Sequence, residues 1–344
     1  MGAKKRNDVW DIVKGLGIVL VVAGHGFGGG ISRFVNLFHI PLFIFVSGLV
    51  FRFEDRSPQK LLTFTKKCLK GLWLPSVIYG TVYVLLHNLF TKIGIYQLEP
   101  YSVKQTAVAV VKHLAFLKTE PLESAMWFFT ALFICRFLLY GVLWISSLIR
   151  QPKAQTAAEL CMVALIFAAG CFFFYRQISL PGNADNACTL LPFIYGGYKL
   201  KHVRLSRVIP AMAGLAVLIG LFLSGHTLRM SRNEITDPLF LLLGSAAGIL
   251  LVFQLADWLK RSKAGLAVLR YIGIHTVPVL CLHLLAFRLV SAIWILCDGL
   301  PKDAFAKHPI VAASYGWGIL YTAFGVSLPL LVPAVQNIIK KRKG

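Results

Sequence analysis

The 344-residue sequence predicts an all-α, polytopic membrane bundle, and its composition carries that prediction. Hydrophobic residues make up 57% and charged residues only 15%, and the mean hydropathy is +0.70. A soluble chain of this length needs more polar surface than such a composition supplies. The cysteines have no paired spacing, so they are expected to pack as small apolar side chains. We therefore expect residues 1–344 to form a single integral membrane domain.

Apolar segments divide the chain into candidate spans. A helix that crosses a bilayer needs roughly 20 mostly apolar residues, and about ten segments approach that length. They lie near 9–28, 34–52, 71–91, 126–146, 158–175, 187–200, 208–224, 238–258, 271–296 and 310–338. The first carries Asp11 and Lys14 and is not followed by a small-residue cleavage site, so we expect it to be retained rather than removed as a signal peptide. In the long stretch 92–125, the apolar piece 103–117 is expected to lie on or dip into the membrane.

The basic residues predict that both termini lie in the cytoplasm. Of the 36 lysines and arginines, 23 fall in the segments that this orientation places inside and 10 in those it places outside. An excess of basic residues on the cytoplasmic side is the pattern that orients membrane proteins. The formal charge of +22 therefore follows from membrane orientation and does not indicate a nucleic-acid partner.

The first span carries ionisable residues on one face. Asp11 and Lys14 are three residues apart and can form an ion pair on a helix. His25 follows Lys14 by eleven residues, which at about 100° per residue returns to within roughly 20° of the same face, roughly 16 Å along the axis. An ionisable side chain at bilayer depth costs about 3 kcal/mol on insertion scales. A lone histidine is more often a satisfied core residue, but the shared stripe favours a functional role for His25.

The second span adds His39 and Ser47, with Phe43 between them at helical spacing. The connection between the first two spans is short, so they are expected to be antiparallel neighbours. His25 and His39 then both lie toward the outer half of the membrane. An interfacial histidine and a packing notch at Ser47 explain the same residues equally well.

Other polar residues have simpler interpretations as well. Lys67 and Lys70, three residues apart at the inner end of the third span, can hold phosphates but are also typical of orientation determinants. Trp127 belongs to an aromatic cluster typical of a membrane interface. Arg136 near mid-span and His283 in the ninth span are not explained by an interfacial position.

The sequence has no P-loop, dinucleotide fingerprint, zinc-protease motif or nucleophile elbow, and no metal site is expected.

These segments together resemble the membrane acyltransferase 3 family, which O-acylates cell-envelope sugars. The most specific matches are the Lys14–His25 stripe and the run from His39 to Gly48. Lys67-x-x-Lys70 is similar to an Arg-x-x-Arg element of the family, and 127–129 and 272–283 resemble later landmarks. Lysines stand where many members have arginine, and lysine binds phosphate without bidentate geometry. Some members carry a further hydrolase-like domain that this sequence lacks, so the chain is expected to act alone or with a separate partner.

The resemblance implies an acyl-coenzyme A donor, usually acetyl-CoA, in a bacterial inner membrane. The acceptor is then a sugar hydroxyl of an envelope polysaccharide or a lipid-linked glycan. The coenzyme A phosphates would meet Lys14, Lys67 and Lys70 at the inner face, and the pantetheine arm would follow the stripe to His25. His25 is expected to be the general base, or alternatively to form a transient acyl-His25 intermediate. The remaining site candidates are Asp11, as partner of Lys14, and His39, Ser47, Trp127, Arg136 and His283 on the substrate side.

A transporter or flippase of a glycan precursor, without covalent chemistry, is the competing interpretation. Ten spans with buried charges suit such a protein. Transporters usually consist of two structurally related halves, and no repeated motif is visible between the halves of this sequence. The sequence therefore favours the acyltransferase, with transfer to an outward-facing acceptor because His25 and His39 lie in the outer half.

Overall fold

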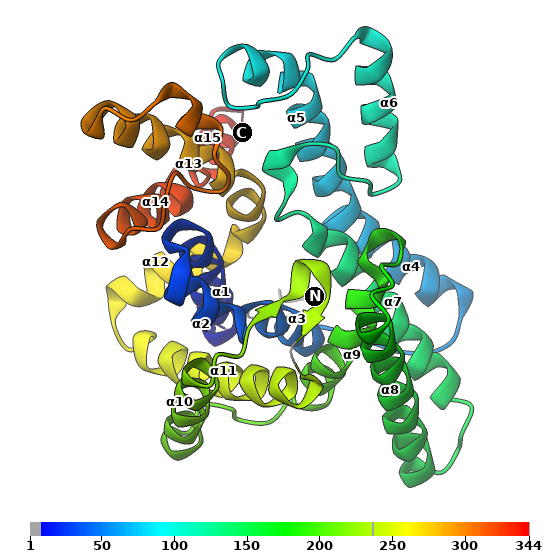
Figure 1. Ribbon diagram of the computed structural model, residues 1–344. Coiled ribbons are helices and arrows are strands. Elements are labelled where there is room, and N and C mark those ends of the chain that lie inside the picture. Colours follow the sequence, from blue (N-terminus) through cyan, green and yellow to red (C-terminus); the bar gives the residue numbers. More distant parts are fainter. Residues whose placement is uncertain (1–7, 236, 344) are drawn as a thin grey trace.

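The computed structural model describes residues 8–235 and 237–343. These residues form a bundle that is 77% helical, which confirms the predicted all-α membrane fold (Figure 1). The helices are α1 (Asp8–Phe27), α2 (Gly29–Asn36), α3 (His39–Leu49), α4 (Pro58–Cys68), α5 (Leu74–Lys92), α6 (Val103–Leu114), α7 (Trp127–Ser146), α8 (Pro152–Tyr175), α9 (Ala184–Lys199), α10 (Val208–Leu223), α11 (Pro238–Leu259), α12 (Lys263–Ile274), α13 (Thr276–Asp298), α14 (Tyr315–Ser327) and α15 (Leu331–Lys343). A π-helical turn, Leu69–Trp73, joins α4 to α5. In the part of the chain described, the strands are the antiparallel pair β1 (Leu228–Arg229) and β2 (Glu234–Ile235).

Eight helical segments of the described chain are long and apolar enough to cross a membrane. They account for eight of the ten expected spans. The segments expected near 187–200 and 208–224 are α9 and α10, which have 16 residues each. At 1.5 Å per residue, each is about 24 Å long and shorter than the roughly 30 Å hydrocarbon core.

Three of the expected continuous spans are interrupted. The second divides between α2 and α3, the ninth between α12 and α13 at His275, and the last between α14 and α15. Pro41, Pro278 and Pro329 lie at or just after these breaks. Proline has no backbone N–H and clashes with the preceding turn, so it favours the start of a helix over its interior.

Helix α1 crosses α12 at van der Waals contact between the two backbones. A Cβ atom built at Gly273 would lie 1.7 Å from the carbonyl oxygen of Asp11, and one at Gly15 would lie 2.2 Å from that of Leu269. Glycine is the residue that permits such an approach between membrane helices. The crossing fixes the inner half of α1, where Asp11 and Lys14 lie.

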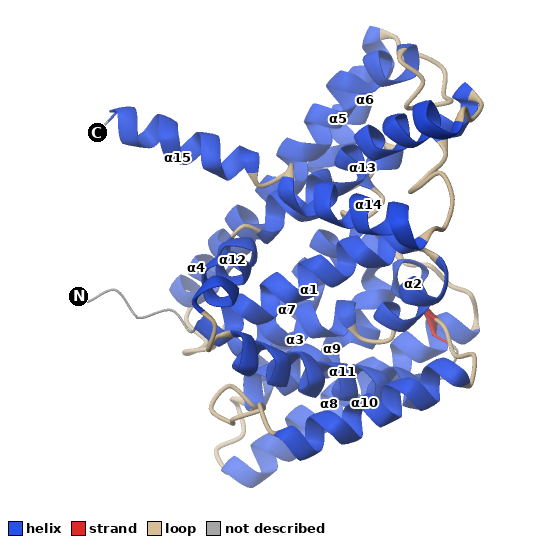
Figure 2. Ribbon diagram, turned by 90° about the vertical axis from the view of Figure 1, so that its left-hand side faces the viewer, coloured by secondary structure: helices blue, strands red, loops and turns tan. Residues whose placement is uncertain are grey.

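The chain enters α1 on the same side of the bundle as α15 leaves it, as an even number of crossings requires (Figure 2). Helices α4 and α12 lie toward this side, and α2 and the two strands lie toward the opposite one (Figure 2). We call these the inner and the outer side. By the distribution of basic residues, the inner side is expected to face the cytoplasm.

Candidate active site

Two cavities follow the ionisable stripe of α1 through the bundle. The inner cavity has a volume of about 200 Å³ and is lined by Lys14. The outer cavity has a volume of about 130 Å³ and is lined by His25. Four residues line both cavities, and they are Val21, Ile40, Phe128 and Leu280. The stripe inferred from helical spacing therefore lies along two adjoining cavities, with Lys14 in the inner one and His25 in the outer one.

The inner cavity is mostly apolar, and Lys14 is the charged residue in its lining. The expected ion pair is present, because Lys14 Nζ lies 2.7 Å from Asp11 Oδ1. The Asp11 carboxylate is almost fully buried, whereas the lysine side chain is 26% exposed. Asp11 thus anchors Lys14 at the wall, and the lysine keeps an accessible surface toward the cavity.

Arg136 reaches the wall of the inner cavity through Ser47. Ser47 lines it, and Arg136 Nη1 donates a hydrogen bond of 3.0 Å to Ser47 Oγ. The Arg136 guanidinium carbon lies 5.4 Å from the ring centroid of Phe51 and 5.7 Å from that of Phe64. These two rings and the serine hold a second positive charge behind the cavity wall. Both residues therefore lie with Lys14 and apart from His25.

Lys67 and Lys70 are exposed and line neither cavity. Lys67 lies in the last turn of α4 and Lys70 in the π-helical turn that follows. Leu72, in the same turn, does line the inner cavity. The two lysines are thus on a segment that borders the inner cavity, while their charges face outward from the bundle.

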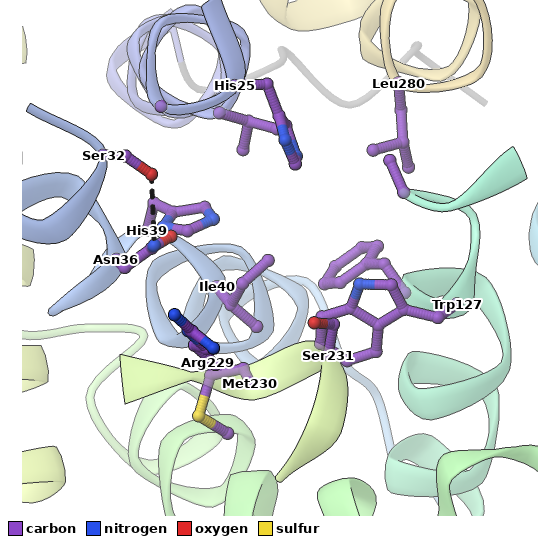
Figure 3. A pocket seen from close by; sticks show the side chains of 14 residues that line it. His25, Ser32, Asn36, His39, Ile40, Trp127, Arg229, Met230, Ser231 and Leu280 are labelled. Carbon is purple, nitrogen blue, oxygen red and sulfur yellow. Dashed lines mark hydrogen bonds between the residues drawn. The ribbon is translucent and has the colours of Figure 1, made fainter. Parts of the chain in front are cut away.

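The outer cavity is the more polar of the two, and Figure 3 shows His25 extending into it from α1. His39 extends from the facing side (Figure 3), with its Nδ1 at 2.9 Å from the carbonyl oxygen of Val35. A carbonyl oxygen only accepts hydrogen bonds, so Nδ1 of His39 carries the hydrogen and Nε2 is left as an acceptor. Trp127 and Asn36 also line this cavity. His25, His39 and Trp127 are therefore brought together from α1, α3 and α7.

His283 lies behind His25. Its side chain is fully buried on α13 and lines neither cavity. The ring centroids of His25 and His283 are 5.3 Å apart. His283 is thus adjacent to the candidate base but separated from the space that a substrate would occupy.

Sequence reasoning missed the hairpin of β1 and β2, which closes one side of the outer cavity. Arg229, Met230 and Ser231 line the cavity from it (Figure 3). The hairpin is anchored by Asn233, whose Nδ2 donates to the carbonyl oxygen of Gly170 at 3.3 Å. Asn233 Oδ1 also accepts a 3.1 Å hydrogen bond from Thr189. In the sequence this region is a short polar stretch between apolar segments, and no local pattern indicates that it folds inward.

Arg288 holds the connection between α13 and α14. Its guanidinium donates to the carbonyl oxygens of Phe305 at 2.8 Å, Lys307 at 2.7 Å and Pro309 at 2.6 Å. His308 Nε2, on the same connection, is 2.9 Å from Ser124 Oγ. Desolvation and the nearby Arg288 charge lower the pKa of His308. These contacts tie the connection to the segment that leads into Trp127.

A family model described as an acyltransferase domain, acyltransferase 3, matches residues 7–332. The match covers every residue that lines the two cavities. No curated protein and no solved structure matches the chain.

Proposed function

The chain belongs to the acyltransferase 3 family and is a membrane acyltransferase, and on that basis we propose that it transfers an acetyl group from acetyl-CoA to a sugar hydroxyl of a cell-envelope glycan. The acceptor is an envelope polysaccharide or a lipid-linked glycan, and the membrane is a bacterial inner membrane. Family membership disfavours the transporter or flippase. The observation that carries the proposal is the placement of Lys14 and His25 in adjoining cavities on one stripe of α1.

The inner cavity suits the acyl donor. Coenzyme A is anionic at its nucleotide end, and Lys14 offers a positive charge at the cavity wall. Lys67 and Lys70 add charge on the neighbouring segment, where they attract the nucleotide without lining the cavity. The apolar lining beyond Lys14 accommodates the narrow pantetheine arm. The arm extends along α1 and carries the thioester to the shared residues below His25.

The outer cavity suits the acceptor. His25 takes the proton of the acceptor hydroxyl while the hydroxyl oxygen attacks the thioester carbonyl carbon. The tetrahedral intermediate breaks its carbon–sulfur bond, which leaves the sugar ester and the coenzyme A thiolate. The His25 imidazolium then returns its proton to that sulfur, so the reaction ends as ester and free thiol. His39 Nε2 and the Trp127 ring hold the sugar in this proposal, which the presence of both side chains at the outer cavity supports.

The first test is release of free thiol from acetyl-CoA by the purified full chain in nanodiscs, with and without an envelope-glycan extract. We expect thiol release that requires the extract and is lost in His25→Ala. His202→Ala is the matched control, because His202 is an exposed histidine that lines neither cavity. Full activity of His25→Ala would refute the assignment of His25 as the base. Absence of both thiol release and coenzyme A binding in the folded wild type would refute the proposed donor.

A further inference from the structure

His283 is placed to orient His25, and the inference rests on the proposed acyl transfer at His25. The His283 ring is packed between His25, at 5.3 Å between centroids, and Phe287, at 5.6 Å. The side chain is fully buried. It therefore acts on a substrate only through His25, and its role is one of positioning.

The hydrogen bonds of His283 fix its tautomer. Nδ1 lies 2.9 Å from the carbonyl oxygen of Val279 and 3.0 Å from that of Leu280. Both oxygens only accept, so Nδ1 carries the hydrogen and Nε2 is an acceptor. Among residues 8–235 and 237–343, the buried Nε2 has no hydrogen-bond partner. A buried acceptor without a partner is costly, and the His25 imidazole is packed beside this one.

We propose that His283 Nε2 accepts a hydrogen bond from His25 and thereby determines which His25 nitrogen is the base. A linear N–H···N bond of ordinary length places two imidazole centroids about 5 Å apart, close to the observed 5.3 Å. The bond requires a rotation of the His25 ring, because in the described orientation His283 Nε2 has no hydrogen-bond partner among residues 8–235 and 237–343. The other His25 nitrogen, toward the outer cavity, then has no hydrogen and takes the proton from the acceptor.

The arrangement has the orienting function of the carboxylate in a Ser-His-Asp triad, but the partner is neutral. A neutral partner fixes the orientation of the ring without adding a negative charge that would stabilise the imidazolium. The imidazolium formed at His25 is therefore a good acid, which suits the return of the proton to the leaving sulfur.

The test is nitrogen-15 NMR of the imidazoles in the full chain in nanodiscs, combined with steady-state kinetics. We expect one His25 tautomer in the wild type and a mixture in His283→Phe, which keeps the ring volume but removes the acceptor. His283→Gln, whose side-chain oxygen reaches the position of Nε2 and accepts, should restore the tautomer. The kcat of His283→Phe should fall about tenfold to a hundredfold with both KM values unchanged, as expected for loss of base orientation, and His283→Gln should recover part of it.

The proposal is overturned if His283→Phe keeps the wild-type His25 tautomer, or if its kcat stays within about twofold of the wild type. If His283→Phe does not fold, the comparison of His283→Gln with His283→Met decides, because these side chains are similar in size and differ in the acceptor. The NMR measurement uses the protein without substrate. It therefore tests the hydrogen bond even if the wild type fails to transfer an acyl group.

A second, independent observation concerns the charge of the acceptor. Arg229 is the charged side chain in the lining of the outer cavity, and that lining contains no carboxylate in the described part of the chain. Its ion pair with Glu234 is weak, since Arg229 Nη1 lies 3.7 Å from Glu234 Oε2 and both side chains are exposed to solvent. An exposed ion pair of this kind contributes little to stability. Arg229 is therefore available to a ligand.

We infer that the acceptor carries an anionic group close to the acylated hydroxyl, and that Arg229 binds it. This deepens the proposed function, because a guanidinium binds phosphate or carboxylate oxygens in a bidentate manner. The anchored Asn233 holds the hairpin, so the charge is positioned before the acceptor binds. Either a diphosphate-linked lipid sugar or an acidic sugar of a polymer supplies such a group.

Three acceptor probes of similar size separate these sources: a polyprenyl-diphosphate oligosaccharide, a uronate-containing oligosaccharide and a neutral one. We expect the wild type to prefer one of the charged probes, and Arg229→Gln to raise its KM at least about tenfold, the loss of roughly 1.4 kcal/mol. Arg33→Gln is the matched control, because Arg33 lies 4.3 Å above the Phe222 ring and does not line the cavity.

The same variants also provide a measurement that does not depend on acyl transfer. Pyrophosphate and glucuronate should raise the Tm of the wild type and of Arg33→Gln but not that of Arg229→Gln. Equal use of neutral and charged acceptors by the wild type would overturn the inference. The inference would also be overturned if the anions shifted the Tm of Arg229→Gln as much as that of the wild type. Absence of any Tm shift in the wild type, Arg33→Gln and Arg229→Gln would overturn it as well.

Discussion

Lys14 and His25 lie on one face of α1 but line different cavities, Lys14 the inner and His25 the outer. Their separation along a single rigid helix places a positive charge and an imidazole at the two ends of one path. A helix fixes such a distance better than a loop, because its side chains cannot move independently along the axis.

Lys14→Met should raise the KM for acetyl-CoA about tenfold, because one charge-assisted contact to a phosphate is worth roughly 1.4 kcal/mol. Lys14→Arg, which keeps the charge, should remain close to the wild type. Initial rates at varied acetyl-CoA provide the measurement. Because Lys14→Met also removes the 2.7 Å ion pair with Asp11, the double variant Asp11→Asn/Lys14→Met is needed to separate binding from stability. An unchanged KM in both variants would contradict the donor site.

Val21→Phe should block the junction of the two cavities, since Val21 lines both. We expect coenzyme A to bind the variant with nearly normal affinity, because Lys14 is retained. Thiol release should fall at least about tenfold, because the thioester no longer reaches His25. Val208→Phe is the control, because Val208 is 63% exposed on α10. Binding by calorimetry and turnover by thiol release distinguish the two effects. Normal turnover in Val21→Phe would show that the thioester does not pass Val21.

Gly273→Ala should destabilise the fold, because its Cβ would lie 1.7 Å from the Asp11 carbonyl oxygen. Forcing α1 and α12 apart is expected to cost about 1–3 kcal/mol, as for other overpacked sites. Gly141→Ala is the matched control, because a Cβ atom there meets nothing within 4 Å. Thermal melts of both variants in the same detergent give the comparison. Equal Tm values would mean that the two helices separate without cost.

Arg288→Gln should loosen the connection between α13 and α14, because a carboxamide cannot replace three donated hydrogen bonds to Phe305, Lys307 and Pro309. Limited proteolysis should then cut within residues 299–314 faster than in the wild type. The rest of the bundle should remain protected, since Arg288 bonds only that connection in the contacts described. A cleavage rate equal to that of the wild type would contradict this role.

Helical spacing was sufficient to predict the stripe of α1, because Asp11, Lys14 and His25 belong to one regular element whose geometry is known in advance. It was not sufficient for contacts between elements. Arg136 and Ser47 are 89 residues apart in sequence, and nothing local to either residue indicates that they meet at the inner cavity.

The hairpin was the larger omission. The side chains that anchor it come from Asn233 and Thr189, 44 residues apart, so its inward position depends on long-range contacts. The length of the apolar segments predicted most of the spans, because every helix that crosses the membrane must match the thickness of the same hydrocarbon core. It did not predict the breaks, since local prolines and packing determine them.

The four residues shared by the cavities, Val21, Ile40, Phe128 and Leu280, are all apolar. A narrow apolar passage repels water unless it is filled, as in hydrophobic gates of channels. In a membrane that maintains a proton gradient, an apolar passage of this kind interrupts any file of water along which protons would leak. If the acyl group passes these four residues, as the proposed function requires, its transfer to the outer side of the membrane does not dissipate the proton gradient.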